Sequence, residues 1–60
     1  MEIDLSTELG RSEARAELIE AELLADGGTP TLKEWRDGYR LLGMSWPGDA
    51  EARRLLPIAE

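Results

Sequence analysis

The sequence predicts a small all-α protein: a three-helix domain with one long N-terminal helix and two short helices. Over most of the chain, apolar residues recur at the three- and four-residue spacing of helices rather than at the alternating spacing of strands. Two stretches that contain Gly and Pro, residues 26–31 and 43–49, divide the chain into three segments. We therefore expect residues 1–60 to form a single domain with helices over about residues 6–26, 31–42 and 47–56.

The first helix is expected to begin at Ser6 or Ser12, because both serines are suitable N-cap residues. It is expected to reach Asp26, since Gly27 supplies the glycine that commonly follows a helix C-terminus. Gly10 costs about 1 kcal/mol relative to alanine inside a helix, so it could instead mark a break after a first short turn. The alternating sequence EIDL leaves a short initial strand as an alternative.

The second helix has the clearest predicted start. Thr31 precedes Glu34 by three residues, which is the spacing of a capping box. A narrow apolar stripe follows at helical spacing, formed by Leu32, Trp35, Tyr39 and Leu42. The third helix is expected to be short, to include residues 49–56 and to stop before Pro57.

The first helix carries more apolar side chains than one face can hold. One seam, at three- and four-residue spacing, consists of Leu5, Leu9, Ser12, Ala16, Ile19 and Leu23. A second seam consists of Ala14, Leu18, Ala21 and Ala25. Two short helices offer enough apolar surface to cover one seam, and each leucine left in water forfeits roughly 1.5–3 kcal/mol.

We therefore expect the protein to dimerise through the long helix. The predicted self-association surface is the second seam, Ala14, Leu18, Ala21 and Ala25, which would meet a second copy related by a two-fold axis. The alternative is a monomer in which the other helices wrap the first helix completely.

The net charge of −6 lies in the first half of the chain. Residues 1–26 hold eight acids and two bases, which gives −6, whereas residues 27–60 hold five of each. An acidic half repels phosphate and attracts basic protein surfaces. We expect Glu13, Glu17 and Glu20 to present this charge to a basic partner; the alternative is a solvated helix face that serves solubility.

The residue types do not favour catalysis. The chain has no cysteine and no histidine, so the commonest metal ligand and the commonest general acid or base are both absent. The sequence DGGTPT lacks the lysine of a phosphate-binding loop. We expect no enzymatic activity, no catalytic residues, no cofactor and no metal site.

The N-terminus is acidic and lacks a continuous apolar stretch, so we expect no secretory signal, and no apolar run approaches the roughly 20 residues of a membrane span. We therefore expect a cytoplasmic protein without a membrane contact.

All aromatic residues fall within the twelve residues 35–46. Trp, Tyr and Arg are the residue types most enriched at binding hot spots, and two arginines flank the aromatic stripe. The predicted partner-binding surface therefore consists of Trp35, Arg36, Tyr39, Arg40 and Trp46. The alternative is that the aromatic rings form the core of the domain.

The sequence TLKEWRDGYRLLGMSWPGDAEARRLL resembles a helix-turn-helix of the excisionase or MerR type. The matching positions are Leu32, Glu34, Leu42, Gly43 and Ser45. The resemblance implies a DNA-binding regulator, but Tyr39 stands where the pattern has a small residue, and Asp49 stands near its buried recognition-helix position. A pI of about 4.5 also opposes phosphate neutralisation.

The sequence GRSEARAELIEAELL is similar to the second helix of ribbon-helix-helix antitoxins, with MEIDLS in the place of their strand. This resemblance implies an antitoxin-type transcriptional regulator. The fold would need another helix between the two matched segments, and none fits there.

The sequence as a whole favours a non-enzymatic, acidic protein–protein interaction module, such as an adaptor, an inhibitor or an assembly factor. Its expected partners are a second copy of itself and another protein with a basic or apolar groove, whereas nucleic acid is not expected. Two alternatives remain: a small helix-turn-helix or antitoxin-type regulator, and an acidic nucleic-acid mimic that blocks a basic partner.

Overall fold

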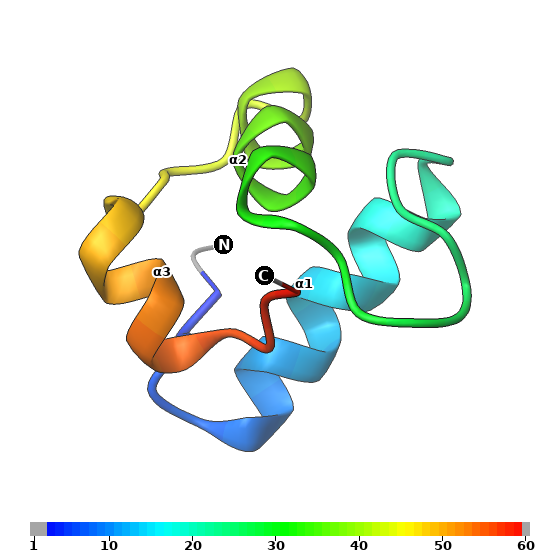
Figure 1. Cartoon of the computed structure of the whole chain (residues 1–60). Coiled ribbons are helices and arrows are strands. Elements are labelled where there is room, and N and C mark those ends of the chain that lie inside the picture. The colour runs from blue at the N-terminus through cyan, green and yellow to red at the C-terminus, as the bar shows by residue number, and fades with distance from the viewer. Residues whose placement is uncertain (1–2, 60) are drawn as a thin grey trace.

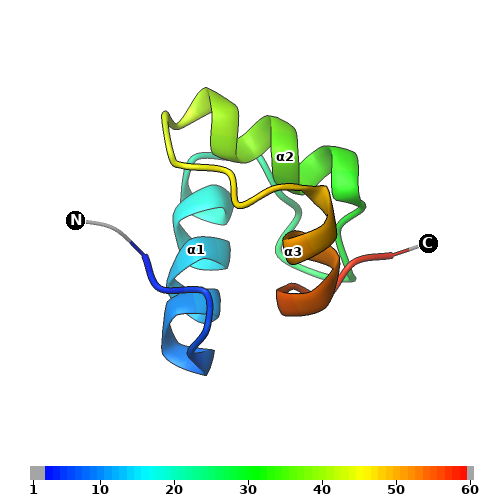
Figure 2. The ribbon, with the colours of Figure 1, turned by 90° about the vertical axis from the view of Figure 1, so that its left-hand side faces the viewer.

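The computed structural model describes residues 3–59, which form three helices and no strand. The helices are α1 (Glu8–Glu20), α2 (Leu32–Leu41) and α3 (Asp49–Leu55). Helix α2 lies across one end of both α1 and α3 (Figures 1 and 2). The fold is compact, with a radius of gyration of 10.2 Å. The all-α, three-helix prediction is confirmed, although α1 has 13 residues and is shorter than expected.

Helix α1 begins one residue after Thr7, so neither Ser6 nor Ser12 is its N-cap. The Thr7 hydroxyl accepts a hydrogen bond from the backbone N–H of Gly10 at 2.9 Å. Gly10 is buried in the first turn, where a Cβ atom would overlap the carbonyl oxygen of Asp4. The glycine therefore does not break the helix but lets the preceding segment cross close over it.

The alternative of a short initial strand over the sequence EIDL is not found in residues 3–5, which belong to the segment that leads into α1. Glu2, the first residue of EIDL, lies outside the described residues.

Helix α1 ends at Glu20, six residues before the predicted end at Asp26. Glu22 adopts a left-handed conformation with φ 63°, and its N–H donates to the carbonyl of Ile19 at 2.9 Å. The next N–H, of Leu23, donates to the carbonyl of Leu18 at 2.8 Å. These two bonds form a Schellman C-cap, so Glu22 takes the place that the sequence assigned to a glycine.

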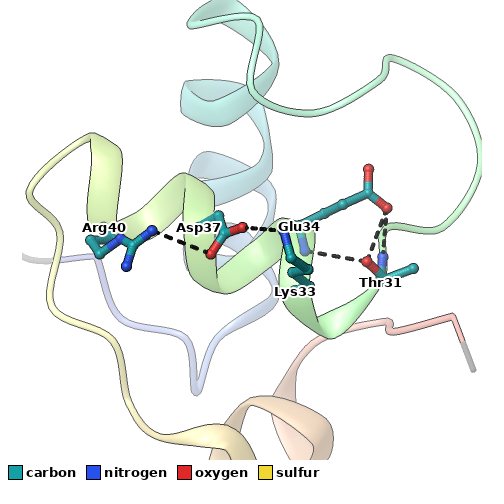
Figure 3. A network of polar contacts seen from close by, with 5 residues as sticks. All are labelled: Thr31, Lys33, Glu34, Asp37 and Arg40. Atoms are coloured by element: carbon teal, nitrogen blue, oxygen red, sulfur yellow. Dashed lines mark hydrogen bonds and ion pairs between the residues drawn. The ribbon is translucent and has the colours of Figure 1, made fainter.

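Helix α2 has the predicted capping box (Figure 3). The Thr31 hydroxyl accepts from the Glu34 backbone N–H at 3.2 Å, and the Glu34 carboxylate accepts from the Thr31 N–H at 3.0 Å. At the other end, Gly43 has φ 69° and Met44 donates its N–H to the carbonyl of Tyr39 at 2.9 Å. This end is a second Schellman cap, this time on the glycine that the sequence predicts.

Helix α3 starts after Gly48 without a side-chain cap and ends at Leu55. Leu56 is extended, as expected for a residue before proline. The chain then returns to the start of α2, where the N–H of Ala59 donates to the carbonyl of Pro30 at 2.8 Å. Figure 2 places this C-terminal segment and the N-terminal segment on opposite sides of the molecule.

The core draws on every helix and on the segments that flank them. Its buried apolar residues are Leu5, Ala14, Leu18, Leu24, Trp35, Tyr39, Ala52 and Leu56. Helices α1 and α2 meet at Leu18 and Gly38, where a Cβ atom on the glycine would lie 2.8 Å from a methyl carbon of Leu18. The glycine therefore sets how closely the two helices approach.

The predicted self-association surface is wrong in two of its four residues. Ala14 and Leu18 are both 0% exposed, because the chain's own core covers them. Ala21 and Ala25 are exposed, but they lie beyond the end of α1 and do not continue its face. The four residues thus do not form one free seam for a second copy.

The other apolar seam is covered only in part, because three of its six residues, Leu9, Ser12 and Ala16, are exposed. Leu5 is buried, Ile19 and Leu23 are half-buried, and Leu9 remains 71% exposed. The early C-cap explains this result, since it turns the chain back and carries Leu24 into the core. The chain therefore buries part of each seam and fully covers neither, and dimerisation stays a prediction.

Candidate interaction groove

An open groove of about 960 Å³ lies between the N-terminal segment, α1, the end of α2 and the loop that follows α2. We call it the acidic groove. The apolar side chains that line it include Ile3, Leu42, Met44, Trp46 and Leu55. Its charged side chains are the carboxylates of Asp4, Glu13 and Glu17, and no lysine or arginine of the described residues lines it.

The aromatic wall of the groove is built by α2 and its following loop. The rings of Tyr39 and Trp46 pack edge to face, with centroids 5.3 Å apart and an interplanar angle of 73°. The Trp46 indole N–H donates to one carboxylate oxygen of Asp49 at 3.0 Å, and Arg36 pairs with the other at 3.3 Å. These contacts fix the half-buried Trp46 ring from behind and leave part of it facing solvent.

Tyr39 lines the groove but is 3% exposed. Its hydroxyl is buried and has no hydrogen-bond partner among the described residues. Burial raises the pKa of the Tyr39 phenol above its ordinary value of 10.0. A buried hydroxyl without a partner costs about 1–3 kcal/mol, which makes this position unusual for a residue kept for packing alone.

The acidic wall is formed by Glu13 and Glu17, which lie one turn apart on α1. Both are exposed, and neither side chain has an ion-pair or hydrogen-bond partner among the described residues. Asp4 differs, because its carboxylate accepts the N–H of Ser6 at 2.9 Å and the Ser6 hydroxyl at 2.6 Å. These two bonds hold the pKa of Asp4 below its ordinary value of 3.8.

The lysines and arginines of the described residues have partners of their own, and none of these side chains lines the groove. Lys33 and Arg40 both pair with Asp37, at 2.9 Å and 3.7 Å (Figure 3). Arg54 pairs with Glu51 at 2.8 Å. The other contacts are Arg36 with Asp49, Arg11 with the Leu5 carbonyl and Arg15 with the Gly28 carbonyl, and Arg53 also has a partner. All seven bases therefore have partners, while Glu13 and Glu17 have none within residues 3–59.

The structure brings together four of the eight predicted partner-binding residues. Glu13, Glu17, Tyr39 and Trp46 come from three different segments and line the same groove. The sequence grouped the acids and the aromatic residues as two separate surfaces, whereas the fold makes them facing parts of one.

The other four predicted residues lie elsewhere. Trp35 is 1% exposed and belongs to the core, where its indole N–H donates to the Pro57 carbonyl at 2.9 Å. Arg36 lies behind the groove on Asp49, and Arg40 pairs with Asp37. Glu20 is exposed but does not line the groove.

Sequence reasoning missed the contribution of the N-terminal segment, Ile3 and Asp4. Its position depends on the close crossing over Gly10. The available signal was Gly10 itself. Glycine destabilises a helix interior, so its presence there indicates that another backbone segment approaches closely.

No helix within residues 3–59 is long and apolar enough to cross a bilayer. The same residues contain no group of three or more acidic side chains placed to hold a metal ion. Comparisons of the chain with protein-family models, with curated proteins and with solved structures gave no significant match.

Proposed function

We propose that this protein is a non-enzymatic, acidic interaction module that binds a basic surface of another protein through the acidic groove. The observation that supports this proposal is that Glu13 and Glu17 stand at the groove without an ion-pair or hydrogen-bond partner among residues 3–59, and that no lysine or arginine of these residues lines it. A partner that supplies cations would complete this surface. We further propose that it acts in the cytoplasm as an adaptor, an inhibitor or an assembly factor.

The aromatic wall supports the same proposal. Protein-binding hot spots combine a large aromatic anchor with polar groups around it, and a partly exposed Trp46 beside two unpaired acids fits that description. Unpaired carboxylates also steer an oppositely charged partner and raise its association rate.

The loop between α2 and α3 does not favour the DNA-binding alternative. A helix-turn-helix joins its helices by three or four residues, whereas residues 42–48 separate α2 from α3 here. Asp49 and Glu51 lie in the first turn of α3, where a DNA backbone would meet like charge.

The test is a capture experiment with the immobilised full chain and extract from its native host. Two double variants remove the same charge: Glu13→Gln with Glu17→Gln inside the groove, and Glu20→Gln with Glu22→Gln outside it. We expect the wild type and the outside variant to retain the same partner, identified by mass spectrometry as a protein with a basic surface. The groove variant should lose it.

Capture that does not depend on the groove acids would overturn the proposal. A gel-shift assay with duplex DNA at moderate salt tests the alternative of a DNA-binding regulator, which predicts that the protein binds the DNA. A captured nucleic-acid-binding protein that DNA displaces in competition would instead favour the acidic mimic.

A further inference from the structure

We infer that the groove takes a short segment of a partner protein that carries an arginine or lysine directly beside one large apolar side chain. This inference rests on the proposed function and defines the chemistry of the partner at the same site. It follows from the way the groove divides into an apolar end and an acidic wall.

The apolar end lies at the C-terminus of α2 and in the loop after it. Leu42 is 38% exposed, and the half-buried Met44 and Trp46 follow it along the chain. All three line the groove. A leucine-sized or larger side chain placed here would leave water and contact all three at once.

The acidic wall faces the same space from α1. Glu13 and Glu17 lie on one helix face, at the spacing of neighbouring side chains on a helix surface. A guanidinium or ammonium group between them would meet two carboxylates with no cation of this chain in competition. Arginine is the better match, because its planar fork can bond to two carboxylate oxygens.

Neither contact is sufficient by itself. Exposed ion pairs contribute little, and one buried side chain does not offset the loss of translational and rotational freedom on association. An occupant that makes both contacts in one groove gains both for a single association cost. The juxtaposition of cation and apolar side chain is therefore the expected recognition signal.

A second copy of this chain is the rival occupant. Arg40 and Leu41 are adjacent, and their side chains are among the more exposed of the molecule, with Leu41 at 67%. Arg40 is, however, already paired with Asp37. A foreign segment with a free cation is the better complement to the groove.

The probes are three capped peptides, Ac-GRLRG-NH2, Ac-GQLQG-NH2 and Ac-GRARG-NH2, titrated into the ¹⁵N-labelled full chain. The two indole N–H signals serve as reporters, since Trp46 lines the groove and Trp35 is bonded to the Pro57 carbonyl in the core. We expect the first peptide to shift the Trp46 signal alone and to bind at least tenfold more tightly than the other two.

The charge variants provide the matched control. Glu13→Gln with Glu17→Gln should weaken Ac-GRLRG-NH2 by at least tenfold and leave Ac-GQLQG-NH2 unchanged. Glu20→Gln with Glu22→Gln should affect neither peptide.

Several results would overturn the inference. The inference is wrong if Ac-GQLQG-NH2 or Ac-GRARG-NH2 binds with an affinity within threefold of that of Ac-GRLRG-NH2. It is also wrong if Ac-GRLRG-NH2 shows no saturable binding, or if it shifts the indole signals of both Trp35 and Trp46. Concentration-dependent sedimentation that Arg40→Gln with Leu41→Ser abolishes would assign the groove to a second copy. If the peptides rank differently but partner capture still requires Glu13 and Glu17, the inference fails and the proposed function stands. If capture does not require Glu13 and Glu17, the proposed function fails as well.

Discussion

The indole nitrogen of Trp35 donates a hydrogen bond to the carbonyl oxygen of Pro57, which lies 22 residues further along the chain, at 2.9 Å. This bond fixes the C-terminal segment against α2. The N–H of Ala59 makes a second attachment of the same segment, to the carbonyl of Pro30. A chain of 60 residues has a small hydrophobic core, so a terminal segment that covers this core contributes directly to stability.

We predict that Trp35→Phe destabilises the protein by about 2–4 kcal/mol, because it leaves a cavity and a part-buried carbonyl without a donor. A domain of this size has about 3–5 kcal/mol in total, so this loss removes a large share of its stability. Urea denaturation followed by circular dichroism measures the loss. Trp46→Phe is the control, and equal losses from the two would contradict the role of the Trp35 bond.

Gly10→Ala should destabilise by about 1–3 kcal/mol, the usual cost of overpacking. In an open helix position the same change would stabilise by about 1 kcal/mol. The sign reverses here because the new methyl group would overlap the carbonyl oxygen of Asp4. Gly27→Ala is the matched control, since nothing lies within 4 Å of its Cβ position. Thermal unfolding of both variants checks the prediction, and a stable Gly10→Ala would refute the close crossing.

Glu22→Gly should stabilise the protein relative to Glu22→Ala by about 1 kcal/mol. Both variants remove the same charge, but alanine keeps the Cβ atom that makes a left-handed residue unfavourable, whereas glycine does not. A gain of this size corresponds to roughly 4–8 °C in Tm for a small domain. Equal melting temperatures for the two variants would mean that Glu22 is not left-handed in solution.

The Glu22 cap also shows where the sequence stops being informative about the fold. The capping box of Thr31 and the glycine after α2 follow local rules, so the bounds of α2 were predictable. The end of α1 was not, because glutamate rarely takes the left-handed position and Gly27 offered a better cap. The misplaced end extended the predicted seam to Ala21 and Ala25, which lie beyond α1, whereas the assignment of Ala14 and Leu18 to an outer surface was a choice of helix face that periodicity cannot decide.

The candidate site was predictable in composition but not in arrangement. The aromatic residues and the acidic helix face stood out, yet periodicity gives relative angles within one helix and says nothing of which helix covers which face. Trp35 and Tyr39 share one stripe and both are buried in the core, but only Tyr39 also lines the groove.

Asp37 should make stability depend on pH in the acid range. A hydrogen bond from Lys33, with the charge of Arg40 nearby, holds the pKa of Asp37 below its ordinary 3.8. The folded state then binds fewer protons than the unfolded state, so this contribution is complete above 3.8 and is lost as pH falls through the folded pKa. Asp37→Asn should therefore be less stable than wild type at pH 7, with the difference closing below pH 3.8.

Denaturation midpoints of the two proteins from pH 7 down to pH 2 measure this convergence. Asp26→Asn serves as the control, because Asp26 is exposed and has no side-chain partner among the described residues. A constant difference between Asp37→Asn and wild type over the whole range would contradict the linkage.

Tyr39→Phe should leave stability unchanged or raise it by about 1 kcal/mol, the opposite of a usual core truncation. The substitution removes a buried hydroxyl that has no partner, while it keeps the ring that packs on Trp46. If the Tyr39 hydroxyl forms a hydrogen bond with a bound segment, the same variant should bind Ac-GRLRG-NH2 more weakly although its Tm is higher. Such opposite signs are expected of a group kept for function at a cost to stability. A Tyr39→Phe variant that loses more than 1 kcal/mol in urea denaturation would show that the hydroxyl already has a partner within the folded chain.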